Sequence, residues 1–274
     1  MDLNNVNELV VPVRRADLPP WREGDGILAG GTWLFSEPQT DLRRLVDVTA
    51  LGWPSVTIHE QGLELAATCT VEQTSALSRT LPADWTAAPL FHQCATALVA
   101  SFKVWKAATM GGNLALSFPA GAMISLVSGL DGTVLVWRPD GGEYRLGIAD
   151  FVTGAATNAM ADGELIRSVF LPATALRGRT AFRKIALSRL GRSGAVVIGR
   201  RDRARDGGAF TLAITGSTTK PVCMTFPAVP SAGQLTAALA EIPDELWHSD
   251  AHGAPDWRRA VSSVLGQEIR DELE

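Results

Sequence analysis

The sequence predicts an α+β protein, in which short strands and helices alternate without a regular βαβ repeat. Short apolar runs bounded by turn residues indicate the strands, and longer segments with apolar residues at helical spacing indicate the helices. Pro139-Asp140-Gly141-Gly142, between two strand-like runs, is typical of a hairpin turn. With 274 residues, 46% apolar and 20% charged, the chain can form one large domain or two modest ones with a sizeable core.

The first unit is expected over residues 1–175, before the polar link Arg177-Gly178-Arg179. Its expected strands cover residues 27–29, 44–48, 56–59, 63–67, 133–137, 143–146 and 163–171. Helices are expected over residues 71–79 and 89–102, and the apolar stretch 123–130 is interpreted as the beginning of another.

A second unit is expected over residues 178–274. Strands at 180–187, 194–200 and 209–215 precede helices at 234–242 and 256–273. A three-stranded sheet covered by helices makes a small core of its own. The basic residues between 200 and 206 are interleaved with acids and followed by Gly207-Gly208, which favours a solvated hairpin turn over a nucleic-acid surface.

Charge and motif content exclude several function classes. A net charge of −4 argues against nucleic acid or an anionic membrane as the main partner. The sequence has no apolar run of membrane-spanning length and no signal-peptide pattern, so we expect a cytoplasmic protein. No G-x-S-x-G, H-E-x-x-H or P-loop lysine motif is present, which leaves hydrolase and NTPase readings without support.

Cysteine and histidine are sparse and do not form metal motifs. Cys69, Cys94 and Cys223 are odd in number and widely spaced, so neither a disulfide framework nor an iron–sulfur cluster is expected. His248 and His252 have helical i, i+4 spacing, but the Asp, Gly and Pro residues around them favour a loop.

Two glycine pairs, in the segments 28–34 and 109–115, predict a ligand site. Gly30-Gly31 follows a strand-like run, and Gly111-Gly112 precedes a turn and the expected helix beginning near residue 123. We interpret both pairs as bare turns, in which adjacent glycines can aim consecutive N–H groups at one anion. A turn without a ligand explains either pair taken alone. The two together favour a nucleotide site.

The segments A-G-G-T-x-L and T-x-G-G-N-L-A resemble the paired FAD-binding signatures of the flavoprotein (medium) subunit of molybdenum hydroxylases, the xanthine dehydrogenase and carbon monoxide dehydrogenase family. The resemblance covers nearly the whole chain and continues in Leu45-Val46-Asp47-Val48-Thr49, Glu164-Leu165-Ile166, Leu171-Pro172, Phe182-Arg183-Lys184-Ile185 and Asp256-Trp257-Arg258-Arg259. It implies a p-cresol methylhydroxylase-type domain of two α+β lobes with FAD extended between them, followed by a small C-terminal domain.

The resemblance also implies which residues bind FAD. The first segment would wrap the pyrophosphate with its backbone, and the Thr32 hydroxyl would add a donor; its residues are Leu28, Ala29, Gly30, Gly31, Thr32, Trp33 and Leu34. In the second segment the side chains of Thr109 and Asn113 match positions that hydrogen-bond the cofactor, and Gly111 and Gly112 match positions of close approach. Further along the chain, Ile166 matches an aliphatic position against the isoalloxazine ring, and Lys184 a lysine near it.

The function that the resemblance implies is electron transfer through FAD. A molybdopterin-binding large subunit and a 2Fe–2S small subunit would be the partners, and NAD or dioxygen would accept the electrons. Two alternatives remain open. One is a flavin-free assembly or scaffold subunit, because Trp105 and Ala122 stand where the family often has arginine and aspartate. The other is a free-standing flavin oxidoreductase, which needs its own acid or base at the flavin.

Overall fold

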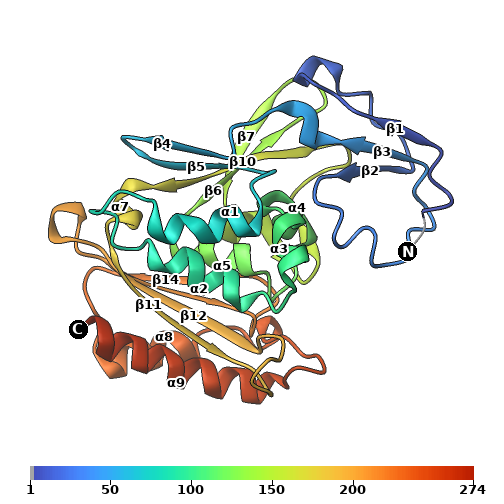
Figure 1. Ribbon diagram of the computed structural model, residues 1–274. Coiled ribbons are helices and arrows are strands. Elements are labelled where there is room, and N and C mark those ends of the chain that lie inside the picture. Colours follow the sequence, from blue (N-terminus) through green and yellow to red (C-terminus); the bar gives the residue numbers. More distant parts are fainter. Residues whose placement is uncertain (1–2) are drawn as a thin grey trace.

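The computed structural model describes residues 3–274. Its two larger sheets are antiparallel, and its helices form two layers (Figure 1). One group of helices lies between the sheets, and the last helices cover the outer face of the second sheet. Short 3-10 turns occur at Arg15–Asp17, Val48–Leu51, Leu77–Arg79, Ala204–Asp206 and Asp244–Leu246. None of the helices between residues 3 and 274 combines the length and apolar character that crossing a membrane requires.

A small parallel sheet lies at the N-terminal end and carries the first glycine motif. Its order is β1 (Glu8–Val10), β3 (Arg44–Asp47) and β2 (Asp25–Leu28). Asp25 and Arg44 form a buried ion pair between β2 and β3, in which Arg44 Nε lies 2.7 Å from Asp25 Oδ1. This ion pair fixes β2, and the glycine motif follows directly where β2 ends at Leu28.

The larger sheet of the first unit has the strand order β4-β5-β10-β6-β7, with every neighbouring pair antiparallel. Its strands are β4 (Val56–His59), β5 (Gly62–Ala66), β10 (Leu165–Pro172), β6 (Thr133–Trp137) and β7 (Glu143–Gly147). The central strand β10 has a bulge between Ile166 and Ser168. The strands predicted from apolar periodicity are confirmed within a few residues at each end.

The helices of the first unit lie between this sheet and the second sheet, and the deepest of them is buried on every side. They are α1 (Val71–Ala76), α2 (Pro89–Ala97), α3 (Phe102–Ala107), α4 (Met110–Leu116) and α5 (Ala122–Gly129). Every residue of α5 is buried, as expected for a helix enclosed between two sheets. The helix expected over 89–102 is divided, because the chain is extended at Leu98 and Ser101 caps a new helix.

The segment between β7 and β11 contains short elements around the long strand β10. They are α6 (Ile148–Phe151), the two-stranded pair β8 (Val152–Gly154) and β9 (Thr157–Asn158), and α7 (Ala173–Leu176). The chain then enters the second sheet.

The second sheet has four antiparallel strands, whereas the sequence predicted three. They are β11 (Arg179–Ile185), β12 (Ala195–Arg201), β13 (Phe210–Thr215) and β14 (Val222–Phe226). The edge strand β14 is brief and begins directly after a proline, and it contributes only Val222, Met224 and Phe226 to the core. So short an alternating run carries a weak strand signal.

Two helices cover the outer face of this sheet: α8 (Ala232–Ala240) and α9 (Pro255–Leu273). α8 begins before the predicted residue 234, because Ser231 and Gln234 form a reciprocal capping box.

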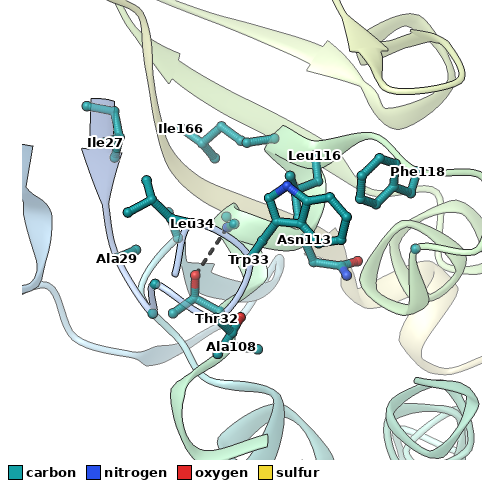
Figure 2. Close-up of a pocket in the computed structure, with 18 of the residues that line it drawn as sticks. Ile27, Ala29, Thr32, Trp33, Leu34, Ala108, Asn113, Leu116, Phe118 and Ile166 are labelled. Carbon is teal, nitrogen blue, oxygen red and sulfur yellow. Dashed lines mark hydrogen bonds between the residues drawn. The ribbon is translucent and has the colours of Figure 1, made fainter. Parts of the chain in front are cut away.

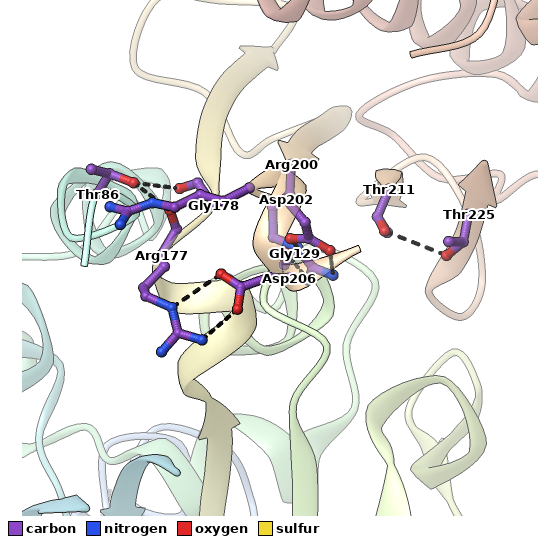
Figure 3. Close-up of polar contacts among 10 residues, drawn as sticks. Thr86, Gly129, Arg177, Gly178, Arg200, Asp202, Asp206, Thr211 and Thr225 are labelled. Carbon is purple, nitrogen blue, oxygen red and sulfur yellow. Dashed lines mark hydrogen bonds and ion pairs between the residues drawn. The ribbon is translucent and has the colours of Figure 1, made fainter. Parts of the chain in front are cut away.

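Polar contacts join the second sheet to the helices of the first unit (Figure 3). Arg200 of β12 lies 2.7 Å from Asp202 and donates to the carbonyl of Gly129, the last residue of α5. Arg177, which follows α7, forms an ion pair with Asp206 in the β12–β13 turn, at 2.6 Å. The expected hairpin between β12 and β13 is confirmed, but the prediction that its charged residues are solvated was wrong, because Arg200, Asp202 and Asp206 are largely buried in this junction.

Candidate functional site

A cavity of about 690 Å³ lies where the two glycine motifs meet. Figure 2 shows Thr32 and Trp33 of the first motif near Asn113, with Leu116 and Phe118 beyond it. The predicted site residues that line the cavity are Ala29, Gly30, Gly31, Thr32, Trp33, Leu34, Thr109, Gly111, Gly112, Asn113 and Ile166. The fold therefore brings together segments that are far apart in the sequence.

The first motif leaves its main-chain donors free. Gly31 has a φ of +66°, a left-handed conformation that glycine adopts readily. The chain then makes one helical turn, in which the N–H of Phe35 donates to the carbonyl of Gly31 at 2.9 Å. Within residues 3–274, the N–H groups of residues 31–34 donate to no other group. Consecutive free N–H groups beside a cavity are the donors that bind a phosphate.

Gly30 has a different reason to be glycine. A Cβ atom at this position would lie 1.8 Å from the carbonyl oxygen of Ala107. The backbone of the first motif thus rests directly on the segment that leads into the second motif. Gly30 is required by the contact between the two motifs, while Gly31 is required by the turn.

The second motif is not a bare turn, and our prediction that its N–H groups face an anion was wrong. Its residues form the first turn of α4, capped by Thr109, whose Oγ1 accepts from the Gly112 N–H at 3.1 Å. The N–H groups of Met110 and Gly111 donate to the carbonyls of Cys69 and Ala67, each at 2.8 Å. The backbone donors of this motif are therefore used inside the protein.

Side chains of the second motif still offer donors to the cavity. Asn113 Oδ1 accepts from the N–H of Met123 at 2.9 Å, which fixes the orientation of the amide. The Asn113 NH₂ group has no partner in the part of the chain that the structure describes. Thr109 Oγ1 accepts a hydrogen bond, and its own hydroxyl proton is available to a ligand at the cavity wall.

The remaining walls are mostly apolar. Ile166, at the bulge of β10, is 3% exposed, and Leu98, Val99 and Leu116 also line the cavity. Such walls suit a planar ring system, with polar donors at one end to fix its orientation.

One carboxylate, that of Glu164, lines the cavity among the described residues. Its Oε2 accepts from the Tyr144 hydroxyl at 2.5 Å and from the Ala161 N–H at 2.9 Å. Burial, together with this hydrogen bond, raises the pKa of Tyr144 to about 12. The Glu164 carboxylate therefore stabilises the cavity wall through these hydrogen bonds.

Two residues at the cavity mouth were not predicted from the sequence. Phe118 packs edge to face on Trp33, with ring centroids 4.8 Å apart. The guanidinium carbon of Arg192, from the β11–β12 loop, lies 5.7 Å from the Phe118 ring centroid. An arginine within Gly191-Arg192-Ser193-Gly194 was the available signal, but its distance in sequence from both motifs concealed it.

Two predicted site residues do not line this cavity. Leu28 is the last residue of β2, and Lys184 is a half-buried residue of β11 opposite Val196. Their contact with a cofactor stays a prediction. Across residues 3–274, no group of three or more His, Cys, Asp or Glu side chains is arranged to hold a metal ion.

A family model described as the FAD binding domain in molybdopterin dehydrogenase matches residues 16–174, more than half of the chain and both glycine motifs. The chain belongs to this family. Its cofactor is FAD, and the molybdopterin dehydrogenases in which this domain occurs are oxidoreductases.

Individual relatives agree with this family. Caffeine dehydrogenase subunit beta of Pseudomonas sp. (strain CBB1) is 28% identical over 155 residues, or 55% of this chain. The aligned part spans about half of that relative's length, 49%.

Two solved structures share the fold over nearly the full length. Reconstituted CO dehydrogenase from Oligotropha carboxidovorans superposes with a TM-score of 0.79 and 20% identity over 100% of this chain and 99% of that one. Quinoline 2-oxidoreductase from Pseudomonas putida 86 gives a TM-score of 0.76 and 20% identity over 100% and 98%. The two-lobe flavoprotein fold with its C-terminal sheet and helices is thereby confirmed.

Proposed function

We propose that this chain is the FAD-binding electron-transfer subunit of a multi-subunit molybdenum hydroxylase of the xanthine dehydrogenase type. The observation that carries this proposal is the row of free N–H groups at residues 31–34 beside the cavity. A pyrophosphate bears two negative charges and is satisfied by such convergent donors. The proposal rests on family membership for the cofactor and on this geometry for its location.

The residues present fit FAD in an extended pose. We place the pyrophosphate against the loop of residues 30–34 and assign the unpartnered NH₂ of Asn113 and the Thr109 hydroxyl as further donors. The apolar walls that include Ile166 would hold the isoalloxazine ring. When bound, FAD supplies a centre that accepts electrons singly and releases them in pairs. The protein binds it, orients it and limits its contact with water.

Partner chains belong to the proposal. A molybdopterin-binding large subunit and a 2Fe–2S small subunit would deliver electrons, and NAD or dioxygen would remove them. The relative named as a subunit of caffeine dehydrogenase supports such an assembly. We also propose a cytoplasmic location and the division into domains over residues 1–175 and 178–274. The ends of β10 at Pro172 and of α7 at Leu176, and the start of β11 at Arg179, support that division.

A free-standing flavin oxidoreductase has less support from the cavity. It would need an acid or base beside the flavin, and Glu164, the one carboxylate among the described lining residues, already accepts two hydrogen bonds. The flavin-free scaffold is distinguished by experiment.

The test is the cofactor content of the purified full chain. We expect a yellow protein with a flavin spectrum, and acid precipitation should release FAD into the supernatant, because neither glycine motif contains a His or Cys to bind it covalently. A colourless protein that takes up no added FAD would favour the scaffold. Release of FMN would contradict the dinucleotide site.

A second test concerns the partners. The chain alone should not hydroxylate a heterocycle, and co-expression with a molybdopterin-binding chain and a 2Fe–2S chain should give a stable complex that does. Urate formation from xanthine by the isolated chain would contradict the proposed division of labour.

A further inference from the structure

A buried arginine of the C-terminal helix ties together the loops beside the cavity. Arg258, in the first turn of α9, is 1% exposed. Its guanidinium donates to the carbonyls of Gly253 at 3.0 Å, Gly194 at 2.6 Å and Gly216, and it pairs with Asp250. Three separate loops therefore share one side chain, and Asp250 compensates its charge.

Two of these loops continue to the cavity mouth. Gly194 ends the β11–β12 loop that carries Arg192, and a Cβ at Gly194 would lie 2.5 Å from the Trp257 ring. On the other side, the N–H of Gly216 donates to the carbonyl of Pro119 at 2.7 Å, next to Phe118. Arg258 thus fixes the segments that bring Arg192 and Phe118 into contact.

Arg192 is the one basic side chain that lines the cavity among the described residues. It is exposed, contacts the face of Phe118 and forms no ion pair within residues 3–274. An unpaired guanidinium at the mouth of a cavity that has free N–H groups on its wall favours an anionic ligand.

We propose that Arg192 supplies the positive charge that faces the anionic groups of FAD in this chain, and that Arg258 is the positioning residue that holds it there. The proposal rests on the proposed FAD site. A lysine in place of Arg192 would keep the charge, whereas methionine keeps similar bulk without charge. Arg189, an exposed arginine of the same loop outside the cavity lining, is the matched control.

The first experiment measures FAD binding to flavin-stripped full-length protein by fluorescence titration at low and high salt. We expect Arg192→Met to weaken binding about three- to tenfold at low salt, with the difference shrinking at high salt, because an exposed charge is screened. Arg192→Lys should retain most of the affinity, and Arg189→Met should bind like the wild type. Equal affinities of Arg192→Met and wild type at both salt concentrations would overturn the proposal.

The second experiment tests the role of Arg258 with Arg258→Lys, which keeps a charge but cannot reproduce the planar fork of donors. We expect folded Arg258→Lys to lose FAD affinity, and the salt dependence of that affinity, to the same extent as Arg192→Met. The double variant Arg192→Met/Arg258→Lys should bind FAD little more weakly than either single variant. Unchanged FAD affinity and salt dependence in folded Arg258→Lys would show that Arg258 serves stability alone. If the wild type itself bound no FAD, the proposed function would fail, which is a separate result.

Discussion

The two glycine motifs look alike in sequence and do different work in the structure. Gly30-Gly31 turns the chain so that the N–H groups of residues 31–34 lie beside the cavity and have no acceptor among residues 3–274. Gly111-Gly112 lies within α4, and its N–H groups donate to Ala67 and to Thr109. One motif presents backbone donors, and the other builds a capped helix whose side chains present donors.

The comparison shows that a glycine pair does not by itself indicate an anion site. Whether the N–H groups near a glycine pair are free depends on the backbone conformation there and on whether acceptors elsewhere in the protein lie within hydrogen-bond distance. Gly111 is glycine because α4 lies on Ala67, where a Cβ would come within 2.6 Å of the alanine Cβ. Four substitutions test this difference between the two motifs, and they are described from the largest expected effect on stability and flavin binding to the smallest.

Gly30→Ala should have the largest effect. The new Cβ would meet the Ala107 carbonyl oxygen at 1.8 Å, and neither backbone can move without separating the motifs. We expect a loss of about 4 kcal/mol in the free energy of unfolding, together with loss of flavin. Urea denaturation and flavin content would measure both. Gly233→Ala is the control that should leave both unchanged or slightly improved, because no atom of the described residues lies within 4 Å of its new Cβ.

Asp25→Ala should destabilise the strand that carries the first motif by about 3 kcal/mol, because it leaves Arg44 buried, with Glu8 at 3.6 Å as its remaining acidic neighbour. Hydrogen exchange should rise at residues 25–34 more than in α4. Asp17→Ala, which removes a surface pair with Arg14, is the control and should leave exchange at both motifs unaltered.

The same ion pair predicts a pH dependence. The Arg44 guanidinium holds the pKa of Asp25 below its usual range, so the stabilisation is complete above the unfolded-state pKa of about 4. It is lost as the pH falls through the lower folded-state pKa. Acid should therefore loosen the first motif in the wild type, and Asp25→Ala should lack this component. Identical acid unfolding profiles of the two proteins would contradict the assignment.

Gly31→Ala tests the turn itself. Its φ of +66° costs alanine about 1–2 kcal/mol, and the Cβ would press on the Phe35 ring at 2.5 Å. Gly52 has a φ of +65°, and among the described residues no atom lies within 4 Å of a Cβ placed there, so Gly52→Ala has a similar backbone cost at a position that does not line the cavity. We expect both variants to lose stability, Gly31→Ala more because of the additional contact with Phe35, and only Gly31→Ala to bind FAD more weakly. Equal FAD affinity in the two variants would show that the free N–H groups do not contact the cofactor.

Gly112→Ala should have the smallest effect. Gly112 is helical, and within the described part of the chain a Cβ there would contact only Thr109 Oγ1, at 3.1 Å. Better helix propensity offsets this contact, so stability should change by less than about 1 kcal/mol and flavin content should be retained. Complete loss of flavin in a folded Gly112→Ala protein would place the cofactor against this backbone and remove the contrast between the motifs.

Much of the fold followed from local pattern. The strand–turn–strand run around Pro139-Asp140-Gly141-Gly142 forms the hairpin of β6 and β7, and the apolar stretch near residue 123 forms α5. Most predicted residues of the two motifs also line one cavity. Errors arose where a signal was short or shared, as in the five-residue edge strand β14 and in the expected helix 89–102, which Ser101 restarts.

The sequence by itself determined the α+β class, the positions of most elements and the family resemblance, because periodicity and turn residues act over short distances. Only the tertiary structure decided which glycine pair keeps its N–H groups free, since the acceptors at Ala67 and Cys69 come from a distant strand end. It also decided that Arg192 reaches the cavity, because Arg258 gathers loops that no local pattern connects. Such contacts depend on packing between remote segments, which sequence spacing does not encode.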